Sequence, residues 1–233
     1  MRHKVLNRKG FIMSNIFTES IGRKLVMSIS GLFLILFLTV HASINSLYLF
    51  SREAFQAGCD FMKLPIISAI VPILAFGFLV HIVYAFILYV QDYKARGPVR
   101  YAVANKSQSD GWASRNMIIL GLLILIGIGL HLYDFWAKMQ LQEFMGNESA
   151  KGPESLEFTF GNLRIYIMYL LWFVCLWLHL NHGFWSAFQT IGWNNNKWLP
   201  RLRAIGIIYS SLLVLIFIAV ATKAFLYSNW VIC

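Results

Sequence analysis

Residues 64–90 read LPIISAIVPILAFGFLVHIVYAFILYV, a stretch without Asp, Glu, Lys or Arg and with one histidine. A run of about 20 apolar residues crosses a bilayer as an α-helix. The chain of 233 residues is 58% hydrophobic and 13% charged, with a mean hydropathy of +0.63, whereas soluble domains are about 25% charged. Four further apolar runs lie at residues 25–50, 116–136, 163–188 and 204–227. The sequence therefore predicts an all-α membrane protein with five transmembrane helices.

The segment 1–24 is polar and basic, and residues 25–228 form the predicted five-helix domain. The first span is too long for a secretory signal peptide, and no small-residue cleavage site follows it. Met13, which stands before SNIFTES, is an alternative translation start to Met1. The first span is therefore predicted to be a true membrane helix.

Basic residues gather in three regions of the chain. Six lie before the first span, five between spans two and three, and three between spans four and five. Lys and Arg near span ends mark the cytoplasmic side, so the N-terminus is predicted inside and the C-terminus outside. The polar segment 138–162 is then an outer loop with a short interfacial helix. The basic side could also dock an acidic soluble partner, although topology alone is the simpler explanation.

Several kinds of site are excluded by the absence of their motifs. The three cysteines, Cys59, Cys175 and Cys233, form no C-x-x-C pair and no C-x-x-C-H motif. This excludes covalent c-type haem and a cysteine-ligated iron–sulfur cluster in this chain. The sequence has no Walker motif and no G-x-G-x-x-G. It therefore predicts no flavin or nucleotide site, and nothing in it indicates nucleic-acid binding.

Each of the first four spans contains a histidine within its apolar run: His41, His81, His131 and His179. An ionisable side chain in the hydrocarbon region is costly and marks a functional candidate. At a rise of about 1.5 Å per residue, the first and third lie about 22–24 Å above the inner ends of their spans, and the second and fourth about 14–15 Å. Two levels of facing imidazoles predict two b-type haems with bis-histidine iron. The alternative is that each histidine is satisfied by a neighbouring helix.

Three of these histidines have a glycine four residues away on the same helix face: Gly77, Gly127 and Gly183. Glycine removes the Cβ that would hold a porphyrin away from the helix. Close packing between helices is the competing explanation. In the fourth span, depth and Gly183 favour His179 as the ligand over His182, which is left for a haem propionate or the membrane interface.

The fourth span also carries a family motif. HLNHGFWSAFQTIG, residues 179–192, resembles the H-x-x-x-G…G signature of the cytochrome b anchors of succinate dehydrogenase and fumarate reductase. In this resemblance His179 is the ligand, and Gly183 and Gly192 are the glycines. GRKLVMSISG, residues 22–31, is similar to the start of the family's first span. Four histidines in five spans of one chain resemble the di-haem branch, over nearly the whole sequence from about Ser14.

The resemblance implies a membrane anchor of a larger respiratory enzyme in a bacterial cytoplasmic membrane. Four helices would bracket two haem b groups, and the fifth, which has no histidine, would pack outside. A flavoprotein with covalent FAD and an iron–sulfur subunit would dock on the cytoplasmic face. Electrons would pass between a dicarboxylate and a quinone, with menaquinone as the expected type. A dimer of such heterotrimers is compatible with this layout.

A quinone site needs an apolar slot and a polar group that exchanges protons. The polar residues at the level of the outer haem are candidates for it: Asn45, Glu53, Asp60 and Asp134. Candidates for the propionates at the inner level are Arg23, Lys24 and Ser28, although Arg and Lys are also ordinary topology anchors.

Two other functions stay open from the sequence. A cytochrome b subunit of a formate dehydrogenase or hydrogenase also has bis-histidine haems, usually with four spans. A transporter with a histidine proton relay is the second, although the chain has neither an inverted repeat nor a discontinuous-helix pattern. The sequence does not distinguish succinate oxidation from fumarate reduction.

Overall fold

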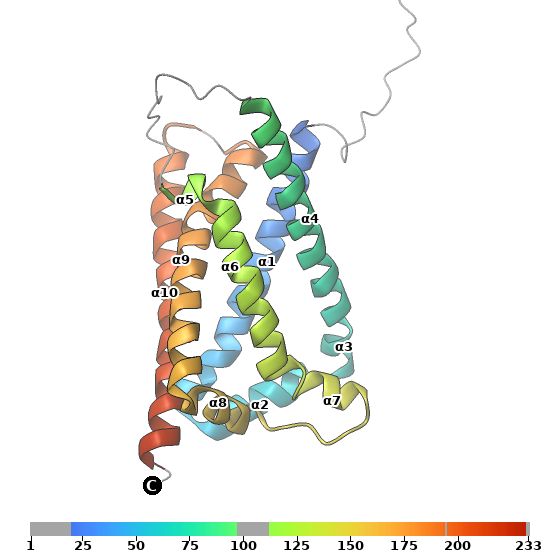
Figure 1. Ribbon diagram of the computed structural model, residues 1–233, viewed down its shortest axis with the longest axis vertical. Helices are drawn as coiled ribbons and strands as arrows, with labels where there is room; N and C mark the ends of the chain where they lie inside the picture. Colours follow the sequence, from blue (N-terminus) through green and yellow to red (C-terminus); the bar gives the residue numbers. More distant parts are fainter. Residues whose placement is uncertain (1–19, 97–111, 194, 232–233) are drawn as a thin grey trace, which may run out of the picture.

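The computed structural model describes residues 20–96, 112–193 and 195–231 (Figure 1). Within these ranges the regular structure is helical and contains no strand. Five segments are long and apolar enough to cross a membrane: Ser20–Phe50, Pro65–Ala95, Met117–Trp136, Leu163–Ile191 and Trp198–Trp230. The prediction of an all-α protein with five membrane-spanning helices is confirmed.

The spans are built from long helices and two π-helical turns. They comprise α1 (Ser20–Phe50), α3 (Pro65–Ser68) with α4 (Ile70–Arg96), α6 (Met117–His131) with a π-turn at Leu132–Trp136, α9 (Leu163–Ile191), and α10 (Trp198–Leu226) with a π-turn at Tyr227–Val231. Short helices lie between them: α2 (Arg52–Met62), α5 (Trp112–Arg115), α7 (Gln140–Phe144) and α8 (Gly152–Gly161). Because α1 begins at Ser20, the last residues of the predicted segment 1–24 are helical, and residues 1–19 lie outside the described part.

Polar caps and one glycine set the ends of several helices. Ser51 accepts a hydrogen bond from the Ala54 N–H at the start of α2, and Asn162 accepts from Arg164 N at the start of α9. Such caps satisfy amide groups that have no partner within the helix. Gly192 ends α9 with a φ of 108°, a left-handed conformation that glycine adopts without a Cβ penalty. The terminal glycine of the quoted motif is therefore a helix stop.

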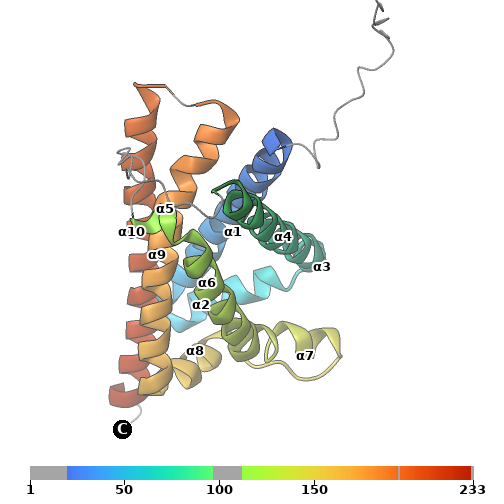
Figure 2. The ribbon, with the colours of Figure 1, turned by 45° about the horizontal axis from the view of Figure 1, so that its top comes forward.

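The five spans form one bundle with an uneven distribution of packing. Helices α9 and α10 run side by side, and α4 lies at the opposite edge (Figures 1 and 2). Helix α1 contacts α4, α9 and α10. None of the residues 70–95 in α4 is buried, whereas nine residues of α10 are. Helix α4, which carries His81, is thus the least enclosed of the spans.

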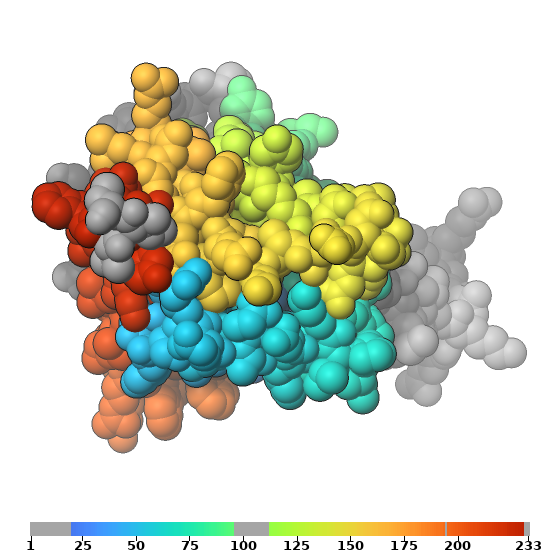
Figure 3. Space-filling view, turned by 90° about the horizontal axis from the view of Figure 1, so that it is seen from below, coloured from blue at the N-terminus to red at the C-terminus, as the bar shows by residue number. Residues whose placement is uncertain are grey.

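The two ends of the bundle differ. We call one the capped end, because α2, α7 and α8 cover it (Figures 1 and 3). Seven of the ten residues of α8 are buried, so this helix within the segment 138–162 is part of the protein core. We call the opposite end, where α1 begins and α9 connects to α10, the basic end, after its Lys and Arg residues: Arg23, Lys24, Lys94, Arg115, Lys197, Arg201 and Arg203.

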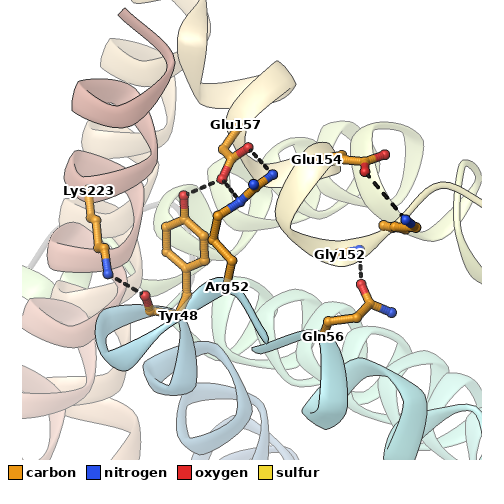
Figure 4. A network of polar contacts seen from close by, with 8 residues as sticks. Tyr48, Arg52, Gln56, Gly152, Glu154, Glu157 and Lys223 are labelled. Carbon is orange, nitrogen blue, oxygen red and sulfur yellow. Dashed lines mark hydrogen bonds and ion pairs between the residues drawn. The ribbon is translucent and has the colours of Figure 1, made fainter. Parts of the chain in front are cut away.

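A polar clasp fastens the capped end (Figure 4). Glu157 of α8 is 5% exposed and accepts hydrogen bonds of 2.9 Å from the Tyr48 hydroxyl and from Arg52 Nη2. From α10, Lys223 Nζ donates to the carbonyls of Tyr48 (2.8 Å) and Leu49 (3.1 Å). A cation at the C-terminal carbonyls of a helix is favourable. Four helices, α1, α2, α8 and α10, are therefore joined at one point.

Candidate haem site

The structure brings the four span histidines together in two pairs. The rings of His41 (α1) and His131 (α6) have centroids 5.7 Å apart. The second pair comes from α4 and α9, and its centroids are 6.4 Å apart, between His81 and His179. These are the two pairs expected from depth along the spans.

The spacing within each pair suits a metal ion shared by two imidazoles. Bonds of about 2 Å to one metal hold the two ring centroids about 6 Å apart, and the observed values lie on either side of this figure. No group of three or more His, Cys, Asp or Glu that could hold a metal ion occurs among the described residues. A haem iron needs only two axial protein ligands, since the porphyrin supplies the rest. The two histidine pairs therefore match the number of protein ligands that haem iron needs, and they are too few for a metal ion held by side chains alone.

The two pairs lie at different levels of the bundle. His81 lies against Ser30 and Gly31 of α1, whereas His41, eleven residues after Ser30 on the same helix, belongs to the other pair. Eleven residues correspond to about 16 Å of helix. The pair His81–His179 thus lies nearer the basic end and the pair His41–His131 nearer the capped end.

Aromatic side chains surround the pair nearer the capped end. His41 is flanked by Phe37 and Phe217, and His131 by Phe135, Tyr169 and Trp172. The centroids of these aromatic rings lie 5.1–6.4 Å from the centroid of the imidazole that each contacts. A wall of this kind excludes water and lowers the local dielectric, two properties that tune a bound redox group.

A serine orients the histidine of α4. Ser30 Oγ is 3.0 Å from the Met27 carbonyl, to which it donates its single hydrogen, and 3.3 Å from His81 Nδ1. With its hydrogen used, Ser30 accepts from Nδ1–H, and the lone pair of the neutral imidazole is then on Nε2. Such a second contact fixes the tautomer and orientation of a ligating histidine. Nothing in the sequence distinguishes Ser30 from the candidate Ser28, which lies two residues away, because the contact with His81 forms between two helices.

Replacing Ser30 with alanine should therefore affect one level alone. In Ser30→Ala the Nδ1–H loses its acceptor, and we expect roughly tenfold weaker haem binding at the level of His81. The redox potential there should rise, since the imidazole becomes less basic. Spectroelectrochemical titration measures both levels in one sample. Ser43→Ala is the matched control, because the Ser43 hydroxyl donates within its own helix to the Thr39 carbonyl. Equal effects on both levels would contradict this role.

The fourth span holds two histidines that differ in their surroundings. His179 faces His81, its Nδ1 is buried without a hydrogen-bond partner in the described part of the chain, and its Cε1 would be 3.9 Å from a Cβ at Gly121. His182 instead lies with its ring 4.9 Å from Trp185. The geometry thus places His179 opposite His81.

The three glycines on the faces of the histidines have different surroundings, which separates helix packing from access for a porphyrin. A Cβ at Gly77 would lie 2.5 Å from Phe33, and one at Gly127 would overlap the Trp172 indole, so both glycines serve close helix packing. A Cβ at Gly183 would meet no described atom within 4 Å. Only Gly183 therefore lies beside open space on the face of its histidine.

The four quinone candidates do not form one site. Glu53 and Asp60 line a shallow groove of about 370 Å³ between α2 and α8, and neither of the other two lines it. Asn45 donates to the His41 carbonyl one turn below it. Asp134 is 8% exposed, accepts from the Tyr169 hydroxyl at 3.0 Å, and lies in the π-turn that follows His131. Asn45 and Asp134 thus lie close to the histidines along the chain, and Glu53 and Asp60 lie at the surface.

Glu53 is poorly suited to proton exchange. A hydrogen bond from its own backbone, followed by one from Ser51, lowers the pKa of this exposed carboxyl below its ordinary value. A proton carrier works best with a pKa near the operating pH, whereas Glu53 is ionised near neutrality. The propionate candidates lie on α1 near the basic end, with Ser28 buried, Arg23 half-buried and Lys24 exposed.

No protein-family model, curated protein or solved structure matches this chain. The site consists of two imidazole pairs at two levels, with no third ligand in the described ranges.

Proposed function

We propose that this chain is a di-haem cytochrome b that anchors a succinate:quinone oxidoreductase in the membrane. The observation that carries the proposal is the stacking of two histidine pairs about 16 Å apart along α1 inside a five-span bundle. A single histidine pair within spans can be satisfied by contact between its own two residues. Two pairs on four successive spans match the ligand set that two haems in one bundle need.

Each residue has a distinct role in this proposal. The four span histidines hold two irons, Ser30 fixes the ring of His81, and the aromatic side chains around His131 exclude water. Haem b, when bound, supplies one-electron transfer between ferrous and ferric iron. The chain then controls the ligands, the spacing between the two levels and the dielectric around each.

The proposed partners follow from what the sequence lacks. It has no flavin, nucleotide or cluster motif, so electrons must enter or leave through other subunits. The basic end offers a positively charged face for an iron–sulfur subunit and its flavoprotein, in line with the motif at residues 179–192. A quinone would react near the capped end, where Asn45 and Asp134 lie within four residues of His41 and His131 along the chain.

Purification in mild detergent from the native membrane tests this function. We expect a heteromeric complex that contains covalent FAD and iron–sulfur clusters and that has succinate–quinone or quinol–fumarate activity. A wash of the complex in high salt should separate this chain from its partner subunits, because salt screens the charged contacts at the basic end. A haem-loaded native complex without a flavoprotein would refute the assignment and favour a formate dehydrogenase or hydrogenase cytochrome. A haem-free protein would favour the transporter.

A further inference from the structure

An arginine near the basic end has unusual surroundings. Arg203 lies in the second turn of α10 and is half-buried, and its guanidinium carbon is 4.5 Å from the centroid of the Trp185 ring. Its Nε is buried and has no hydrogen-bond partner among the described residues. Buried polar groups nearly always have a partner, so Arg203 Nε calls for an acceptor beyond those that the described residues supply.

Three residues form what we call the Arg203 cluster: Arg203, Trp185 and His182. Trp185 is buried, and its ring lies 4.5 Å from the guanidinium and 4.9 Å from the His182 ring. Stacking on an indole occupies a face of the guanidinium and leaves its edge, which carries the N–H donors, directed elsewhere. The cluster can therefore bind an anion edge-on, as a guanidinium binds a carboxylate.

No carboxylate of the described chain neutralises this arginine. The four ion pairs in the described ranges are Arg52–Glu157, Lys63–Glu143, Lys138–Asp134 and Lys151–Glu154, and all of them lie at or near the capped end. Trp185 and Arg203 Nε are both buried, so this part of the cluster lies within the protein, where α9 and α10 pack together.

We infer that the Arg203 cluster binds a carboxylate of the porphyrin held between His81 and His179. The inference rests on the proposed function. Trp185 follows His179 by six residues, which places the cluster about 9 Å nearer the basic end on the same helix. Arg203 thus fixes the orientation of this haem, with its propionate edge towards the basic end, and favours haem over porphyrins without free carboxylates.

A comparison of two porphyrins in two proteins tests the inference. The full-length chain is produced in haem-deficient cells, purified in detergent, and titrated with haem and with haem dimethyl ester, which lacks the carboxylates. We expect Arg203→Gln to weaken haem binding at the level of His81 by about tenfold or more, and to leave ester binding unchanged. Arg201→Gln is the matched control, since Arg201 is exposed on the same helix and stacks on Trp198 at 5.5 Å.

The outcomes separate the possible failures. An equal loss with haem and with the ester would overturn the inference, because Arg203 would then act through folding, a lipid phosphate or a partner. No loss with either porphyrin would overturn it as well. If the unaltered chain bound neither porphyrin, the haem function itself would be wrong, and the inference would fail with it.

Discussion

His179→Ala should remove the low-spin spectrum of one haem out of two, while His182→Ala should keep both. His179 faces His81 across 6.4 Å, whereas the His182 ring lies against Trp185. Loss of one imidazole leaves the iron with a single protein ligand, so it becomes high-spin or dissociates. The pyridine haemochrome assay should give two haems per chain for the unaltered protein and for His182→Ala, and the optical spectrum of the intact His179→Ala protein should show only one low-spin haem.

Variants at the two haem levels serve as controls for each other. His41→Ala should affect the other level, so the two single variants should lose different components in a redox titration. A combination of both should lose all low-spin haem while the helical circular dichroism is retained. Loss of haem in His182→Ala together with its retention in His179→Ala would reverse the ligand assignment in the fourth span.

Gly127→Leu should be the most damaging glycine substitution in α6. Even a Cβ at this position would overlap the Trp172 indole, which donates to the Ile124 carbonyl at 3.2 Å and lies 5.9 Å from the His131 ring. Overpacking of this kind costs about 1–3 kcal/mol. We expect a lower thermal unfolding temperature and selective loss of the haem bound at His131.

Gly129→Leu is the matched control on the same helix. A Cβ at Gly129 would meet no described atom within 4 Å, so we expect a change within about 0.5 kcal/mol, typical of a substitution away from packed features. Thermal unfolding followed by circular dichroism, together with the haem content, measures both variants. Similar losses in the two proteins would show that the contact between Gly127 and Trp172 does not determine stability.

The sequence predicts the parts of this molecule that depend on distance along one helix. Apolar runs reveal the spans, and the fixed rise per residue pairs His41 with His131 without any structure. The sequence does not predict contacts that form between helices. Ser30 and Arg203 belong to this second class, because each is defined by a partner on another span.

Glu157 shows the same limit at the capped end. In the sequence it is one acid among several in a polar loop. In the structure it is buried, because α8 folds back onto the bundle and Tyr48 and Arg52 supply donors more than 100 positions away. Loop composition predicts exposure on average, and only tertiary donors can make a buried glutamate stable.

The clasp also bears on the order in which the bundle is completed during synthesis. Helix α1 is synthesised well before α10, yet the carbonyls of Tyr48 and Leu49 near its C-terminal end are bonded by Lys223 of α10. Tyr209 of α10 likewise donates to the Ile35 carbonyl at 3.1 Å. Contacts between such distant segments form late, after the intervening chain is in place. Helix α1 therefore reaches its final hydrogen bonding only after α10 has been synthesised, and a chain shortened before Lys223 leaves that end of α1 open.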